Sequence, residues 1–488
     1  MNSVILVFGL AALPLALLAA SNWRYAFLAA ILAGFAQDPI RKVLAGQPIT
    51  MVVFSAFVLM FALAGAIMKH GMITMRPMAG NSPRTHALLR LFVFYVLIQA
   101  VLALLRFQSV MIPAIGSLAY LLPIPALWMA YQFVRSSADV GRFLRVYAAI
   151  GVFMALSIFL GNAGFGSTLL EPIGGDRIIF DRVAGIVETN SGWFRSAEVA
   201  AWHSGAVACM AIVLSVAFGG ALTRLLTPGV VLFCVYAAVL TGRRKVLAVA
   251  MLFCAIYYLG NYYFQKRSSR RGGVVIVLMV FLILAGALTM APEASTWSPY
   301  LARSSTVFSD SWERFSGLGL GSIRDGLGAG GFFGMGTGAG AQGTQAFGAG
   351  GGVVVGGASE GGLGKITAEL GLPGLLLAVA SAWLVARQVR RAIGLAAAAD
   401  PRLLKMCLGL LAFVAANVPV FIGASQIYGD PFVLIMLGSM LGFVLAVPRI
   451  LRLREMHERQ LAQVRSLNAG GVAMHQPAYP LDRRPPAV

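Results

Sequence analysis

Charged residues are scarce in this chain. They make up 11% of its 488 residues, and 59% of the residues are hydrophobic; soluble domains carry about 25% charged residues. A membrane-spanning helix needs about 20 mostly apolar residues. The apolar runs here are continuous rather than alternating, which favours helices over a β-barrel. The composition therefore excludes a soluble domain and predicts an all-α, polytopic transmembrane helix bundle.

Two further absences narrow the function. The chain has no Gly-x-x-x-x-Gly-Lys-Ser/Thr motif, which excludes ATP-driven transport by this chain alone. The net charge is +20, but the basic residues lie between apolar runs and form no basic, aromatic-interleaved stretch, so nucleic acid is not an expected partner. The four cysteines lie inside apolar runs without metal-ligand spacing, and we interpret them as packing residues: Cys209, Cys234, Cys254 and Cys407.

Thirteen apolar runs are candidate spans. The first is not typical of a cleaved signal, because no basic residue precedes Arg24. Twelve spans is the alternative, because the second run is short. The runs predict a transmembrane domain over residues 1–450 and a basic, partly disordered tail over 451–488. They lie at about 4–20, 23–37, 49–68, 87–105, 111–133, 144–160, 201–218, 228–241, 246–264, 274–291, 366–386, 406–424 and 430–447.

The distribution of Lys and Arg predicts the orientation. If the tail is cytoplasmic and the spans alternate, the excess positive charge falls on the cytoplasmic side, as the positive-inside rule expects. We therefore expect a multi-pass protein of the bacterial inner membrane with two long periplasmic loops, at about 161–200 and 292–365. The second loop contains a tract from Gly317 to Gly364 in which 21 of 48 residues are glycine, a composition typical of a flexible segment.

Three consecutive basic residues go against this charge bias. Arg243, Arg244 and Lys245 join two spans on the side expected to be periplasmic. An anion could hold them there, because arginine binds phosphate through a planar two-pronged fork. The alternative is a topogenic or lipid-headgroup contact.

Ionisable residues near the ends of other spans are further candidates. Arg195, Glu198 and His203 stand at the start of the seventh span. An imidazole there serves as a general base, as a pyrophosphate contact or as an interfacial hydrogen-bonding group. Glu369 lies inside an apolar run, and we expect an arginine partner for it. Glu360 and Arg314 lie in the second long loop, as a candidate acid or base and a candidate anion-binding residue.

Several of these short motifs together resemble the O-antigen ligase and polymerase superfamily of bacterial polysaccharide assembly. The resemblance covers about residues 1–450 in architecture. Its best motif is the Glu-Leu-Gly-x-x-Gly span after a large loop. The matching pieces are Gln37-Asp38-Pro39-Ile40-Arg41-Lys42, Phe194-Arg195-Ser196-Ala197-Glu198 with Ala201-Trp202-His203, Gly242-Arg243-Arg244-Lys245, the Gly-x-Gly-x-Gly loop, and Glu369-Leu370-Gly371-Leu372-Pro373-Gly374.

The resemblance implies a metal-independent glycosyltransferase without a cofactor. It would take an oligosaccharide on undecaprenyl pyrophosphate as donor, beside membrane lipids and other polysaccharide assembly proteins. Glu360 or His203 would be the base, with Glu198 and Glu369 in support. Ligases of the superfamily typically have a histidine nine residues before the matching glutamate, where this chain has Glu360, which favours a polymerase over a ligase. The pyrophosphate or glycan would be held by Arg195, Arg243, Arg244, Lys245 and Arg314.

Two other classes remain open. One is a transporter of polysaccharide or lipid-linked sugar, although the chain shows no repeat between its halves and few charges at span centres. The other is a non-catalytic membrane subunit of a polysaccharide assembly complex.

Overall fold

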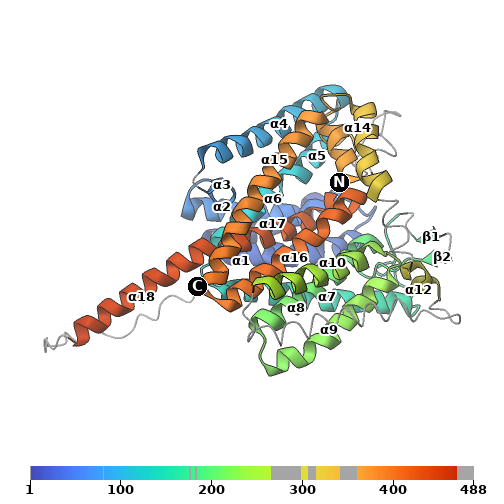
Figure 1. Cartoon of the computed structure of the whole chain (residues 1–488). Coiled ribbons are helices and arrows are strands. Elements are labelled where there is room, and N and C mark those ends of the chain that lie inside the picture. Colours follow the sequence, from blue (N-terminus) through green and yellow to red (C-terminus); the bar gives the residue numbers. More distant parts are fainter. Residues whose placement is uncertain are drawn as a thin grey trace.

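The protein is a bundle of long helices, as a computed structural model shows (Figure 1). The structure describes residues 2–80, 82–174, 177–181, 184–264, 298–305, 315–340 and 360–469. Its elements are α1 (Asn2–Val43), η1 (Ile49–Val53), α2 (Phe54–His70), α3 (Arg76–Ala79), α4 (Pro83–Phe107), α5 (Met111–Leu121), α6 (Pro123–Phe133), α7 (Ser137–Asn162), β1 (Ile178–Asp181), β2 (Gly185–Glu188), α8 (Ala197–Phe218), α9 (Ala221–Leu240), α10 (Lys245–Phe264), α12 (Ser298–Ser305), η2 (Phe315–Gly321), α14 (Ser322–Gly330), α15 (Gly362–Ala399), α16 (Pro401–Gly423), η4 (Gln426–Gly429), α17 (Pro431–Leu445) and α18 (Val447–Ala469).

The all-α polytopic bundle is confirmed, and the chain is a multi-pass membrane protein. Within the described ranges, ten helices are long and apolar enough to cross a membrane, or up to eleven with the bent pair α17–α18. This is fewer than the twelve to thirteen spans predicted. One reason is that α1 counts once although it holds two predicted spans; another is that the run at 274–291 lies outside the described residues.

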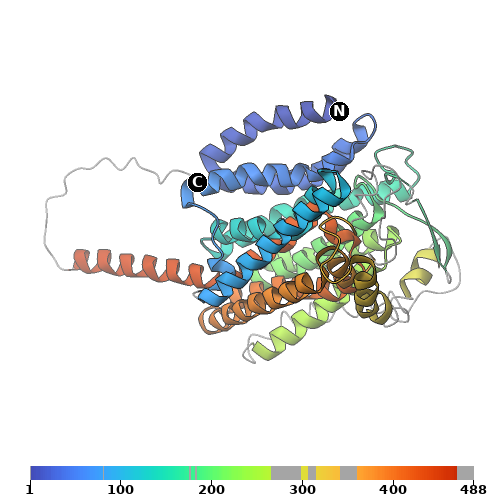
Figure 2. The same cartoon turned by 90° about the horizontal axis from the view of Figure 1, so that it is seen from above.

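Helix α1 is a hairpin rather than one straight rod. Its backbone leaves the helical region at Asn22, and both arms pack beside the start of α2. The ring of Phe8 lies 5.4 Å from that of Phe54, and the Gln37 side chain accepts a hydrogen bond from the Ser55 amide at 3.2 Å. A straight helix would put residues 8 and 37 about 44 Å apart. The two short runs predicted at 4–20 and 23–37 are therefore the arms of this hairpin, with the first arm at the edge of the bundle (Figure 2).

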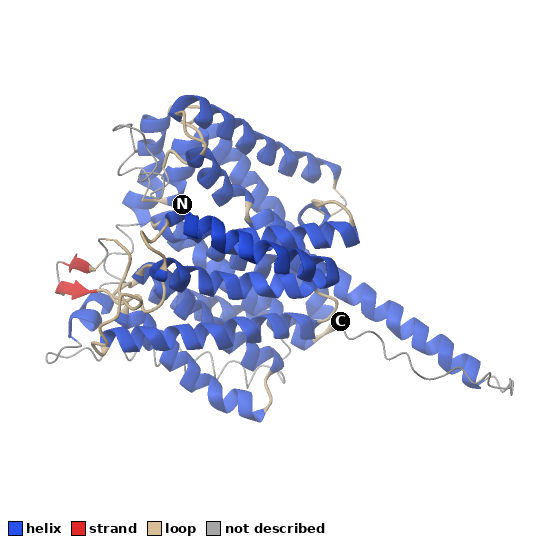
Figure 3. Ribbon diagram, turned by 180° about the vertical axis from the view of Figure 1, so that it is seen from behind, coloured by secondary structure: helices blue, strands red, loops and turns tan. Residues whose placement is uncertain are grey.

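The bundle has two distinct ends. One end carries the β1–β2 hairpin, α12 and α14, and we call it the loop face; the other carries α3 and the start of α18, and we call it the tail face (Figure 1). The hairpin holds the only strands in the described part of the chain (Figure 3). Helix α18 extends away from the bundle at the tail face. The first part of the predicted tail is therefore helical, because α18 continues through residue 469.

Helix α8 forms the centre of the bundle. Of its most apolar stretch, 94% is buried, more than in any other candidate span that the structure describes. Small residues allow this, because neighbouring helices approach closely where side chains are short. A Cβ at Gly205 would lie 2.3 Å from a methyl group of Val246. The Trp202 indole donates to the Asn417 side chain at 2.9 Å, which fixes α8 against α16.

A break in α15 shapes the loop face. Gly371 has φ +68° inside this helix, and a Cβ there would lie 2.2 Å from the carbonyl oxygen of Phe332. Part of the glycine tract fills the break through its backbone: the amides of Met335 and Gly336 donate to the carbonyls of Ala368 and Glu369, at 2.8 and 2.9 Å. Residues 336–340 are buried, so the flexibility predicted for the whole tract is wrong for this segment.

Candidate functional site

A cavity of about 320 Å³ opens at the loop face. It forms where segments far apart in the sequence meet: the end of α1, the residues around the start of α8, the glycine segment, the first turn of α15 and the turn before α17. We call it the loop-face cavity. The polar and charged residues used below that line it are Arg41, Arg195, Glu198, Gly340, Lys365 and Asp430.

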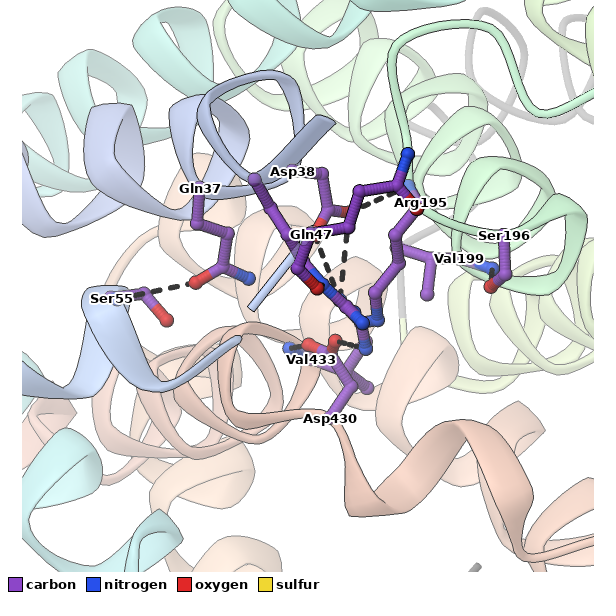
Figure 4. A network of polar contacts seen from close by, with 10 residues as sticks. Gln37, Asp38, Gln47, Ser55, Arg195, Ser196, Val199, Asp430 and Val433 are labelled. Atoms are coloured by element: carbon purple, nitrogen blue, oxygen red, sulfur yellow. Dashed lines mark hydrogen bonds and ion pairs between the residues drawn. The ribbon is translucent and has the colours of Figure 1, made fainter. Parts of the chain in front are cut away.

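Arg195 is held between two buried carboxylates (Figure 4). Its Nη1 lies 3.1 Å from Asp38 Oδ1, and its Nη2 forms an ion pair with Asp430. Burial by itself lowers the pKa of this guanidinium, but the charges of Asp430 and Asp38 outweigh it and raise the pKa overall. Arg195 therefore lines the cavity as expected, but its charge is already matched by the protein, which supports a clamp joining α1, α8 and α17.

Two other cations of the cavity lack such a partner among the residues that the structure describes. Arg41 is half-buried and donates from Nε to the carbonyl oxygen of Gln47 at 3.0 Å. Lys365 is 8% exposed. Within the described ranges, neither side chain has a carboxylate within ion-pair distance. A buried cation without a carboxylate is costly unless something anionic balances it. These two residues are therefore the strongest candidates for anion binding in the cavity.

Sequence reasoning missed both of these residues as site residues. Arg41 belongs to the Gln37–Lys42 motif, where its position between two apolar runs, on the face with little excess charge, was a usable signal. Lys365 is the last residue of Gly362-Leu363-Gly364-Lys365. In the sequence this segment is typical of the end of the flexible tract. Lys365 became identifiable only because α15 begins at Gly362, earlier than the apolar run suggests.

The basic turn before α10 lies beside the cavity. Lys245 donates from Nζ to Glu198 Oε1 at 3.2 Å and to Gln426 Oε1 at 2.6 Å. Arg243 lines a small recess next to the cavity, together with Glu198 and Lys245. Arg244 is in the same turn but is not among the residues lining either space. The structure thus brings three of the predicted residues together: Arg195, Glu198 and Lys245, with Arg243 adjacent.

Arg303, from the second long loop, contacts this basic turn. Arg303 of α12 donates from Nε to the carbonyl oxygen of Gly242 at 2.8 Å and pairs with Asp181 at 2.7 Å. The Asn190 amide donates to the carbonyl oxygen of Leu240 at 3.0 Å. Both long loops therefore contact the turn that carries the Arg-Arg-Lys motif.

His203 lies away from the cavity. It is 1% exposed, and its ring stacks between those of Phe194 and Phe432, with centroids at 5.6 and 4.6 Å. Its Nδ1 lies 2.9 Å from the Tyr147 hydroxyl. These surroundings favour a packing role, with one polar partner, over the predicted role of base.

The two predicted glutamates at and after the end of the second long loop, Glu360 and Glu369, differ in placement. Glu369 is fully buried, and its Oε1 accepts a hydrogen bond from the Gly340 amide at 3.1 Å. No arginine pairs with it in the described part of the chain, contrary to our expectation; a backbone amide takes that place. Glu360 is exposed, and its carbonyl oxygen accepts from the Ser425 amide at 2.7 Å, so it lies at the rim of the cavity. Arg314 lies outside the described residues.

Comparison with known proteins adds no identity: no protein-family model and no curated protein sequence matches this chain.

Proposed function

We propose that this chain is a glycosyltransferase that polymerises or transfers an oligosaccharide carried on undecaprenyl pyrophosphate, with the loop face on the periplasmic side of the bacterial inner membrane. The observation that carries the proposal is the loop-face cavity itself. Arg41 and Lys365 line it without carboxylate partners among the described residues, and an anionic leaving group is what such a pair would stabilise. The membrane location of the site suits a lipid-linked donor.

The reaction requires one bond to form and one to break. An acceptor hydroxyl attacks the anomeric carbon of the donor sugar, and the bond between that carbon and the pyrophosphate oxygen breaks. The hydroxyl proton passes to a carboxylate, and undecaprenyl pyrophosphate leaves as an anion. Arg41 and Lys365, which both line the cavity, would stabilise the negative charge that develops on the leaving oxygens.

Glu198 is the base that the geometry favours. Of the two described carboxylates that line the cavity, Asp430 is engaged by Arg195 and caps α17 through the Val433 amide at 2.9 Å. Within the part of the chain that the structure describes, Glu198 is bonded only to Lys245, through one of its two oxygens. A lone pair therefore remains for the acceptor proton. Glu360, at the rim, is the second choice.

A transporter is the alternative that one observation favours. Transporters often place substrate at an interrupted helix, and α15 is interrupted at Gly371. Here, however, the glycine segment occupies the break and bonds the carbonyls of Ala368 and Glu369. That arrangement leaves fewer backbone groups for a transported ion or sugar, so we prefer the transferase.

Surface polysaccharide in a deletion strain tests the proposal. Wild type should restore polymer, whereas Arg41→Ala and Lys365→Ala should each lower polymer output at least tenfold at matched protein level, with single lipid-linked units accumulating. Arg106→Ala is the control, because Arg106 is exposed at the end of α4 and does not line the cavity. Unchanged polymer in the deletion strain, or full rescue by the Arg41→Ala/Lys365→Ala double variant, would contradict the proposal.

A further inference from the structure

A second, larger cavity lies at the opposite end of the bundle. It measures about 920 Å³ and forms between the segment around α3, the end of α6, the last third of α15 and the start of α18. We call it the tail-face cavity. Among the described residues, it shares no lining residue with the loop-face cavity, so its chemistry is independent of the function proposed above.

The charge of the tail-face cavity is strongly positive. In the described part of the chain, four arginines line it against a single carboxylate, that of Glu455: Arg76, Arg391, Arg449 and Arg452. Within the described ranges, none of these four arginines has an acidic side chain within 4.0 Å. Arg454 lies on α18, as Arg449 and Arg452 do, but does not line the cavity. It pairs with Glu458 at 3.0 Å and with Asp400 at 3.7 Å. Carboxylates therefore pair with an arginine nearby but, among the described residues, with none of the four arginines that line the cavity.

One of the four arginines is fixed in place. Arg449 donates from Nη1 to the carbonyl oxygen of Tyr131 at 2.7 Å and to Gln132 Oε1 at 2.8 Å. Its guanidinium also lies 5.5 Å from the centre of the Tyr131 ring. A guanidinium carries five N–H donors, so the groups not engaged by Tyr131 and Gln132 remain for an oxyanion. Arg449 thus offers a pre-positioned donor in the wall of the cavity.

Part of the remaining wall is apolar. Leu395, Leu451 and Met456 line the cavity together with the arginines, and Met456 is 53% exposed. The cavity lies at the tail-face ends of α2 and α6, two helices that belong to candidate membrane spans. A ligand with a phosphate at one end and hydrocarbon at the other matches this lining better than a free ion does.

We propose that the tail-face cavity binds the phosphate headgroup of an anionic phospholipid. Arg391 and Arg452, both exposed, would grip the phosphate by charge-assisted hydrogen bonds together with Arg449. The glycerol and upper acyl chains would lie against Leu451 and Met456. The site would anchor α18 at the membrane surface.

Native mass spectrometry of the purified full-length protein tests this site. The protein is titrated with phosphatidylglycerol and with phosphatidylcholine of the same acyl chains. We expect phosphatidylglycerol to bind at least tenfold more tightly, and Arg391→Gln/Arg452→Gln to lose that preference. Arg454→Gln, the paired arginine of the same helix, should keep it. Equal binding of both lipids, or an unchanged preference in the double variant, would overturn the proposal.

Two further measurements determine which feature of the lipid is recognised. Inorganic phosphate should not compete with phosphatidylglycerol at millimolar concentration; competition at that level would identify a free-phosphate site and overturn the lipid assignment. Arg391→Lys/Arg452→Lys keeps both charges and should retain most of the lipid preference with an unchanged thermal midpoint. Loss of preference in that variant, at an unchanged thermal midpoint, would overturn the proposal that these charges hold the lipid phosphate.

Discussion

The guanidinium of Arg195 forms an ion pair with the carboxylate of Asp38, which lies 157 residues earlier in the chain; Nη1 and Oδ1 are 3.1 Å apart. The backbone amide of Arg195 donates to the same carboxylate, also at 3.1 Å. With Asp430 on its other side, this arginine fastens three helices at the mouth of the loop-face cavity.

Removing this clamp should destabilise the whole bundle. Arg195→Ala leaves two buried carboxylates without a cation, and breaking a buried pair in this way costs about 3–5 kcal/mol. We expect a clearly lower thermal midpoint in detergent. The control is Arg177→Ala, which breaks an ion pair with Glu171 whose side chains are 62% and 48% exposed and so should change little. Equal midpoints for the two variants would contradict the clamp.

The break in α15 should not tolerate a Cβ. In Gly371→Ala, the new methyl group meets the Phe332 carbonyl oxygen and the backbone has positive φ, so we expect a loss of about 1–3 kcal/mol. Gly394→Ala lies in the same helix with no atom within 4 Å of the new Cβ, and it should be neutral or slightly stabilising. Thermal unfolding of both variants measures the difference. A Gly371→Ala protein as stable as Gly394→Ala would show that the glycine segment does not pack in the break.

His203 should matter for stability rather than for proton transfer. His203→Phe removes the hydrogen bond with Tyr147 but keeps an aromatic ring between Phe194 and Phe432. We expect polymer output to persist at matched protein level, with stability lower by about 1–3 kcal/mol. Tyr147→Phe, which removes the same bond from the other side, should have a similar effect. Loss of output by about 10²-fold with normal stability would restore the imidazole as base.

The carboxylate that accepts the proton can be identified by amide substitution. Glu198→Gln keeps the shape of the side chain and a partner for Lys245 but removes the basic oxygen, so polymer output should fall by about 10²-fold or more. Glu360→Gln, at the exposed rim, should lower output less. Quantified polymer at equal protein level decides between them. The reverse order of effects would assign the base to Glu360.

Most of the fold could be predicted from apolar runs, because a bilayer imposes a length and a composition on each span. The two predicted runs on either side of Asn22 illustrate this, because they form the two arms of α1, which is interrupted at Asn22. Alternation of loops also put Arg41, Arg195 and Lys245 on one face, and the structure has all three at the loop face. The local sequence was enough to predict these spans, because each span must meet the length and composition requirement of the bilayer by itself.

The site was less predictable, because its charge balance depends on distant partners. Nothing next to Arg195 in the sequence shows that Asp38 and Asp430 neutralise it, and nothing next to Lys365 shows that it has no such partner among the described residues. Composition also misled at the glycine tract. Glycine is typical of flexible linkers, but it is also the residue that lets backbone fill a helix break, as residues 331–340 do beside Gly371.

The clamp on Arg195 also bears on biosynthesis. Arg41 belongs to α1, whereas Lys365 belongs to α15 and Asp430 directly precedes α17, so both are synthesised much later than Arg41. In a nascent chain that ends before residue 430, Arg195 therefore has only one of its two carboxylate partners. In a chain that ends before residue 365, the part of the cavity that Lys365 and Asp430 line is also missing. The loop-face cavity can form completely only after α17 has been inserted, so partial products released earlier should be inactive and open to quality-control proteolysis.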